Sequence, residues 1–243
     1  MDQKTRKPEI EHSASLLFQF RRLGEFIGLR LMLGLLGAVV GLFFFGWLTE
    51  EVLKGETVKF DDAVRLFVHN LASPAITELM RFATFLGSTV FLCTLGLCVA
   101  VAFYLSGWRR AVILFVVTMA GAIALNFALK AGVHRIRPEP YFDTPLPSSF
   151  SFPSGHALFS VCFYGVLAWL ITARIKSRAA QTGIWALAVA LIFLIGLSRV
   201  YLGVHYPSDV VAGYAAAFVW VFAVAFSDSL LRKRFPKSQK FEN

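Results

Sequence analysis

Charged residues are scarce in this sequence: only 16% of its 243 residues are Asp, Glu, Lys or Arg, while 57% are hydrophobic. Soluble domains are usually about 45–50% apolar and about 25% charged. A soluble protein of this size could not cover so much apolar surface with so few charges. The composition therefore excludes a soluble globular domain and predicts an integral membrane protein.

Cysteine is also scarce, and all three cysteines lie inside apolar runs, at Cys93, Cys98 and Cys162. An odd number of such thiols gives no disulfide framework, and no spacing of Cys and His indicates a zinc site. The polar blocks described below have no carboxylate cluster of the kind that binds Mg²⁺. We therefore expect no metal and no other cofactor.

The net charge of +9 does not indicate a nucleic-acid partner. The positive residues lie between apolar runs instead of along one polar face, so membrane topology accounts for them. By our assignment of the loops, one side of the membrane carries 16 of the 24 Lys and Arg residues and the other side carries 8. The richer side should be cytoplasmic. We expect a multi-pass protein of the cell (inner) membrane with both termini in the cytoplasm.

Six apolar runs are long enough to cross a bilayer as helices, which takes about 20 residues. They are continuous instead of alternating, which favours helices over barrel strands. The runs are 29–49, 88–105, 110–130, 156–174, 182–201 and 209–229. The predicted fold is all-α: one six-helix membrane domain over 29–230. A polar segment over 1–28, without the pattern of a cleavable signal peptide, precedes it, and a basic tail over 231–243 follows it.

The segment 50–87 is predicted to add short amphipathic helices. Apolar residues recur there at helical spacing: Phe60, Val64, Phe67 and Leu71. A helix lying in the outer membrane interface and a helix packed against the outside of the bundle both fit this pattern. The stretch 74–88 is expected to be a second interfacial or re-entrant helix.

Three polar blocks stand at the ends of apolar runs, at 130–138, 153–156 and 198–209. If the runs span the membrane, all three blocks emerge on one face, the periplasmic or extracellular side. Together they hold cations, imidazoles, a serine and a carboxylate. These are the groups that phosphate capture and nucleophilic phosphoryl transfer require.

His205 and Asp209 are the candidate nucleophile or base and its partner. A carboxylate that accepts a hydrogen bond from Nδ1 would leave Nε2 as a free lone pair. Ser208 is a natural cap for the last helix. The alternative is that Asp209 simply caps its helix while His205 is a surface loop residue.

Ser154, Gly155 and His156 open the fourth run, where the unpaired N–H groups of a helix start form a natural anion site. His156 could protonate a departing oxygen there. In the alternative interpretation, Ser154 only caps the helix and His156 is an interfacial ring.

Lys130 and Arg137 could bind one phosphate from two directions. Arg199 lies close to the hydrocarbon core, where an unpaired cation costs free energy, so it is also a candidate site residue. The alternatives are snorkelling to lipid headgroups for Lys130, and snorkelling or a structural ion pair for Arg199. His134 and Arg135 are expected to face headgroups. The loop 139–152, with Glu139 and Asp143, should line the approach.

At these residues the chain resembles the type 2 phosphatidic acid phosphatase superfamily, the lipid phosphate phosphatases. That family carries Lys, six residues and Arg-Pro, as 130–138 does here. It then carries Pro-Ser-Gly-His, as at 153–156. Last comes Ser-Arg, five residues, His, three residues and Asp, as at 198–209. All three blocks match in order, and the resemblance covers roughly residues 60–230.

The resemblance implies a role for each matched position. His205 would be the nucleophile that forms a phosphohistidine, Asp209 would orient it, and His156 would be the general acid. The remaining matched residues would hold the phosphoryl oxygens: Lys130, Arg137, Ser154, Gly155 and Arg199.

The implied enzyme is a metal-independent phosphoric monoester or diphosphate hydrolase acting on a membrane lipid phosphate. Candidate substrates are undecaprenyl diphosphate, phosphatidylglycerol phosphate, phosphatidic acid, diacylglycerol pyrophosphate and lipid A phosphate, with undecaprenyl diphosphate as the first guess. Three alternatives stay open: a phosphotransferase, a catalytically silent lipid-phosphate binder or transporter, and a relative of the vanadate-dependent haloperoxidases, against which the six spans argue. The sequence leaves the oligomeric state open.

Overall fold

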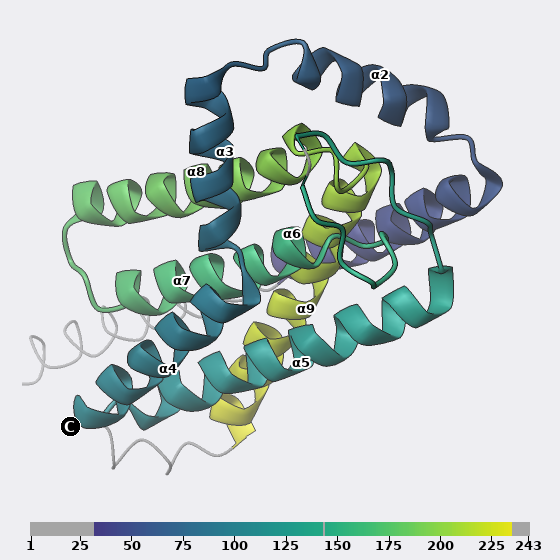
Figure 1. The fold of residues 1–243 in the computed structure, drawn as a ribbon. Helices are drawn as coiled ribbons and strands as arrows, with labels where there is room; N and C mark the ends of the chain where they lie inside the picture. The colour runs from purple at the N-terminus through teal and green to yellow at the C-terminus, as the bar shows by residue number, and fades with distance from the viewer. Residues whose placement is uncertain (1–31, 143, 235–243) are drawn as a thin grey trace, which may run out of the picture.

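The computed structural model describes residues 32–142 and 144–234, which form helices and loops without a strand in these ranges (Figure 1). The first described helix is Met32–Lys54. The others follow in chain order: α2 (Val58–His69), α3 (Pro74–Leu86), α4 (Thr89–Leu105), α5 (Arg109–Val133), α6 (Gly155–Ser160), the π-helical turn η1 (Val161–Gly165), α7 (Val166–Thr172), α8 (Arg178–Tyr201) and α9 (Pro207–Arg234). The all-α prediction is therefore confirmed for the described residues.

Within the described part of the chain, five helices are long and apolar enough to cross a membrane. They are Met32–Lys54, Arg109–Val133, Gly155–Thr172, Arg178–Tyr201 and Pro207–Arg232. The third is built from α6, η1 and α7 in succession. These five correspond to five of the six predicted runs, each within a few residues at the ends, although residues 29–31 of the first run lie outside the described ranges.

The predicted run 88–105 is not an independent span of the same kind. Its helix α4 has 17 residues and forms a pair with α3 that is bent by 51°, and only the pair together passes as a span. The break follows from the sequence, because the Ser88 hydroxyl accepts a hydrogen bond from the Phe91 amide and so starts a new helix. Residues 32–142 and 144–234 thus contain five candidate membrane helices, or six when the bent pair counts as one.

The structure describes only a small part of the predicted terminal segments. Residues 1–28 and 235–243 lie outside the described residues. The tail predicted to begin at residue 231 starts inside α9, which continues to Arg234.

The helix predicted between the first two runs exists as α2, and its polarity is the reverse of a soluble amphipathic helix. Phe60 and Phe67 are 59% and 66% exposed, whereas Asp61 is fully buried. An outward apolar face suits a helix that lies against lipid, and an inward carboxylate needs partners in the protein. Those partners include Arg135 and Ser208, which belong to the first and third polar blocks.

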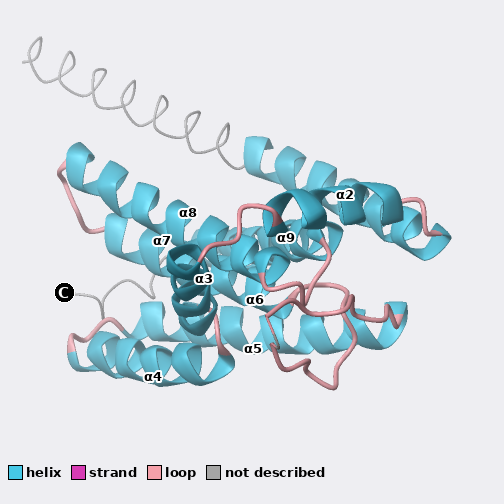
Figure 2. Ribbon diagram, turned by 45° about the horizontal axis from the view of Figure 1, so that its top comes forward, coloured by secondary structure: helices cyan, strands magenta, loops and turns pink. Residues whose placement is uncertain are grey.

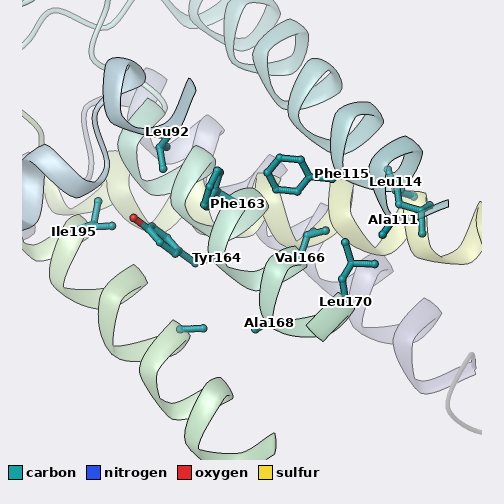
Figure 3. Close-up of a cluster of buried hydrophobic side chains, with 12 residues drawn as sticks. Leu92, Ala111, Leu114, Phe115, Phe163, Tyr164, Val166, Ala168, Leu170 and Ile195 are labelled. Atoms are coloured by element: carbon teal, nitrogen blue, oxygen red, sulfur yellow. The ribbon is translucent and has the colours of Figure 1, made fainter. Parts of the chain in front are cut away.

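A cluster of buried apolar side chains holds α5, η1 and α8 together (Figure 3). Phe115 of α5 meets Phe163 edge-on, with ring centroids 5.3 Å apart. Closer to the polar blocks, Gly213 allows α9 to approach α6: a Cβ at this position would lie 2.7 Å from the Ser154 carbonyl oxygen. The close packing of α6 on α9 fixes where the second polar block stands relative to the third.

Candidate active site

The three polar blocks meet at one end of the bundle. The long loop between α5 and α6 lies beside the start of α9, where Figures 1 and 2 show it next to α6 and α2. Backbone hydrogen bonds attach it there: the Tyr141 amide donates to Leu202 O at 2.9 Å, and the Ser154 amide donates to Asp209 O at 2.9 Å. Gly203, with φ of 77°, makes the α8–α9 turn and leaves room for Tyr141.

His205 stands between a carboxylate and a guanidinium. Its Nδ1 is 3.2 Å from Asp209 Oδ2, and its Nε2 is 2.9 Å from an Arg137 terminal nitrogen. Because Arg137 only donates, Nε2 must be the acceptor, so the proton is on Nδ1 and points to Asp209. The lone pair of Nε2 therefore faces the cations.

Burial keeps this imidazole uncharged. His205 is 2% exposed, and desolvation lowers its pKa to about 3, although the hydrogen bond and the charge of Asp209 act in the opposite direction. A neutral ring at pH 7 is the form that can act as a nucleophile. The interpretation of His205 as a surface loop residue is wrong, because the side chain is buried.

Asp209 is fixed by four groups at once. Besides His205, its carboxylate accepts hydrogen bonds from the Tyr206 amide at 3.0 Å, from Arg135 at 2.7 Å and from the Ser151 hydroxyl. Ser208 is not the cap of α9, because it lies within the helix and turns its hydroxyl to Asp61 at 2.7 Å. The first turn of α9 is thus organised around two buried carboxylates.

The three predicted phosphate-binding cations have no carboxylate partner within 4.0 Å among the described residues. Lys130 donates to the Phe150 carbonyl oxygen. Arg137 donates to the Ser149 and Val204 carbonyl oxygens at 2.8 and 2.9 Å. These backbone oxygens hold the side chains in place and leave their positive charge uncompensated.

Of the three cations, Arg199 gives the strongest indication of an anion-binding site. It is 6% exposed, its terminal nitrogen contacts the Thr84 hydroxyl, and its Nε is buried without a hydrogen-bond partner among the described residues. The side chain therefore neither snorkels to the membrane surface nor, among the described residues, forms the structural ion pair considered above. A buried guanidinium with an unused donor is what an anion-binding site requires.

The second block lies against these cations. Ser154 is fully buried and caps α6. Gly155 is close to the buried Asn126 amide, whose oxygen has no hydrogen-bond partner within residues 32–142 and 144–234. His156 is half-buried and lies near enough to Lys130, Arg137, Arg199 and His205 for its charge to interact with all four. The structure therefore brings the predicted catalytic and phosphate-binding residues together; the roles assigned to them stay predictions.

Arg135 does not face lipid headgroups, contrary to the expectation from sequence. Its side chain is 12% exposed and bridges two buried carboxylates, at 2.7 Å from Asp209 and 2.8 Å from Asp61. Sequence reasoning also missed Asp61 and Ser151 as partners of this network. Nothing in the local pattern distinguished Asp61 from its exposed neighbour Asp62, because only the tertiary fold brings α2 to the start of α9.

The loop 139–152, which was predicted to line the approach to the site, is described except for one residue. The Glu139 carbonyl oxygen accepts a hydrogen bond from Arg65 at 2.8 Å, which ties the loop to α2. Asp143 lies outside the described residues. No group of three His, Cys, Asp or Glu residues gathers in the described part of the chain, and the expectation of a metal-free site stays a prediction.

The PAP2 superfamily profile matches residues 111–230, which include all three polar blocks. The chain belongs to the PAP2 superfamily. The resemblance seen in the sequence is thereby confirmed.

Within the PAP2 superfamily, phosphatidylglycerophosphatase B of Bacillus subtilis is 29% identical over 198 residues, which cover 80% of this chain and 96% of that protein. The crystal structure of a transmembrane PAP2-type phosphatidylglycerolphosphate phosphatase from the same organism superposes with a TM-score of 0.73 at 27% identity, over 80% of this chain and 96% of that one. An undecaprenyl-diphosphatase of Sulfolobus acidocaldarius is 33% identical over 44% of this chain and 50% of that protein. PAP2 relatives that match this chain are thus phosphatases of lipid phosphates.

Proposed function

We propose that this protein removes the terminal phosphate of a membrane lipid phosphate or diphosphate by way of a phosphohistidine on His205. The observation that carries the proposal is the geometry around this residue. A neutral imidazole, oriented by Asp209, directs its lone pair into a group of three cations that have no carboxylate partner among the described residues. A phosphate dianion would supply the missing counter-charge.

In the proposed first step, Nε2 of His205 attacks phosphorus while the bond from phosphorus to the leaving oxygen breaks. Arg137, Lys130 and Arg199 stabilise the charge on the equatorial oxygens. The Nδ1 proton stays on the ring, and Asp209 stabilises the positive charge that the ring acquires. His156 gives its proton to the leaving oxygen.

In the proposed second step, water attacks the phosphohistidine. His156, now deprotonated, takes a proton from this water, the bond from Nε2 to phosphorus breaks, and inorganic phosphate leaves. The cations that this chain supplies do the work that a metal ion does in other phosphatases. No cofactor is required by the scheme.

We propose phosphatidylglycerol phosphate and undecaprenyl diphosphate as the first substrates to test. One relative that matches this chain is named a phosphatidylglycerophosphatase and another an undecaprenyl-diphosphatase. The match to the first covers nearly the whole length of that relative. We further propose that the site faces the non-cytoplasmic side of the membrane, because the loops assigned to the opposite side carry most of the Lys and Arg residues.

The test is a phosphate-release assay with the purified protein in detergent, using both substrates together with phosphatidic acid, with and without a chelator. We expect release from at least one lipid, unaffected by the chelator. The substitution H205A should abolish turnover, because it removes the proposed acceptor of the phosphoryl group, while the thermal unfolding transition is kept.

Other outcomes would contradict the proposal in different ways. Full activity of the H205A protein would exclude the phosphohistidine. Loss of activity in chelator would exclude the metal-free scheme. Transfer of labelled phosphate to an added alcohol in place of water would show a phosphotransferase, and binding without release would show a silent binder.

A further inference from the structure

Arg135 lies between two buried carboxylates from distant parts of the chain. One terminal nitrogen donates to Asp209 Oδ1 at 2.7 Å, and the other donates to Asp61 Oδ2 at 2.8 Å. The Tyr206 ring covers the guanidinium, with its centroid 4.0 Å away. Each carboxylate therefore takes one nitrogen, and Arg135 cannot bind Asp209 with both.

Asp61 is itself held rigidly. It is fully buried on α2, and its Oδ1 accepts the Ser208 amide at 2.9 Å while its Oδ2 accepts the Ser208 hydroxyl at 2.7 Å. Ser208 adjoins Asp209 in the first turn of α9. Asp61 thus reaches Asp209 by two routes, through Arg135 and through the α9 backbone.

The division of the two guanidinium nitrogens has a geometric consequence. Arg135 occupies only Oδ1 of Asp209, so Oδ2 remains for His205 Nδ1 at 3.2 Å. Without Asp61, both nitrogens of Arg135 would be free to form the bidentate pair that guanidinium and carboxylate groups favour. Such a pair would compete with the imidazole for Oδ2.

The charges lead to the same conclusion. Asp61, Arg135 and Asp209 together carry a net charge of −1, which faces a ring that becomes positive when it is phosphorylated. Without Asp61, the remaining pair would be neutral, and the positive ring would lose its counter-charge in a buried site, where electrostatic effects are strong.

We propose that Asp61 is a positioning residue, which acts through Arg135 to keep one oxygen and the negative charge of Asp209 available to His205. The interfacial helix α2 is then a part of the active-site machinery. This inference rests on the proposed function, because it needs His205 to accept a phosphoryl group. Asp61 lies outside the three polar blocks, and in the described part of the chain it forms no hydrogen bond or ion pair with a predicted phosphate-binding residue.

The test compares D61N with D62N in the phosphate-release assay. Both substitutions remove one negative charge from α2 at nearly constant shape, but the Asp62 side chain is 59% exposed and forms an ion pair with Arg65 at 3.5 Å. We expect D61N to lower kcat about 10- to 100-fold, as misplacement of a catalytic group by roughly 1 Å does. KM and the inhibition constant of inorganic phosphate should stay the same, because the cations are untouched. D62N should retain wild-type kcat.

Two further variants separate positioning from a purely structural role. R135K keeps the positive charge but cannot bridge two carboxylates with a planar fork, so it should lower kcat as D61N does, and it serves if D61N fails to fold. In an R135Q background, adding D61N should cost little more, since the residue through which Asp61 acts is gone.

The outcomes are distinguishable. Wild-type kcat in D61N and R135K, or a loss expressed in KM and phosphate binding, would overturn the positioning role while the proposed function stands. An effect of D61N that is equally large with and without Arg135 would also overturn it. Failure of the wild-type protein to release phosphate from any lipid would overturn the proposed function, and this inference with it.

Discussion

Burial decides the protonation state of His205, and the same burial links the stability of the protein to pH. In an unfolded chain this imidazole takes up a proton below about pH 6.5. In the folded protein its pKa is lowered to about 3, chiefly by desolvation. Between these values the unfolded state binds one more proton than the folded state. The contribution of the neutral His205 ring to the free energy of unfolding is therefore fully present above pH 6.5 and is lost as the pH falls towards 3.

We accordingly expect the substitution H205Q to flatten the acid limb of the stability profile. The melting temperature of the wild-type protein in detergent should fall between pH 7 and pH 4 more steeply than that of the variant, because the variant has no imidazole to protonate on unfolding. Differential scanning fluorimetry over this range measures both profiles. Parallel profiles would show that His205 keeps an ordinary pKa in the folded state.

At the scale of the elements, the site depends on how closely α6 packs on α9. The Ser154 amide donates to the Asp209 carbonyl oxygen at 2.9 Å, and Gly213 gives the two helices room to approach. Helix packing thus places the end of α6 that is predicted to bind phosphate next to the start of α9. A side chain at position 213 would have to displace backbone, because its nearest neighbour is the Ser154 carbonyl oxygen at 2.7 Å.

The substitution G213A should therefore lower both stability and activity. Overpacking of this kind costs about 1–3 kcal/mol, and the displaced Ser154 should reduce kcat by about 10-fold or more. G183A is the matched control: it also places a methyl group in a helix, but nothing lies within 4 Å of the new Cβ. The control should be neutral or slightly stabilising. Equal effects of the two variants, in melting temperature and phosphate release, would exclude the packing argument.

The helices were predictable where apolar runs are continuous, because a bilayer demands length and hydrophobicity that the sequence displays directly. The break at Ser88 was harder to predict from the sequence, because one capping serine within an apolar stretch does not indicate a bend of 51°. Lys130, Arg137 and His205 were predicted as site residues because they stand in polar blocks at the ends of apolar runs, and their spacing also follows a family pattern. Asp61 and Arg135 were not predicted as partners in the site, because their ion pair joins residues 74 positions apart and exists only in the tertiary fold.

At the scale of the whole molecule, the site lies at one end of the bundle, and the excess of Lys and Arg in the loops assigned to the other end predicts that the site faces away from the cytoplasm. Ser148 and Ser106 test this sidedness. Both are exposed, Ser148 in the loop beside the site and Ser106 in the turn before α5, at the opposite end of that helix.

Single cysteines at these two positions, in a background with Cys93, Cys98 and Cys162 replaced by alanine, should react differently with a membrane-impermeant maleimide. In intact cells S148C should be labelled and S106C should not, because the reagent reaches only the outer face. After permeabilisation both should be labelled, which confirms that each thiol is accessible. Labelling of S106C alone in intact cells would place the site on the cytoplasmic face, and lipid phosphates would then have to reach it from the inner leaflet.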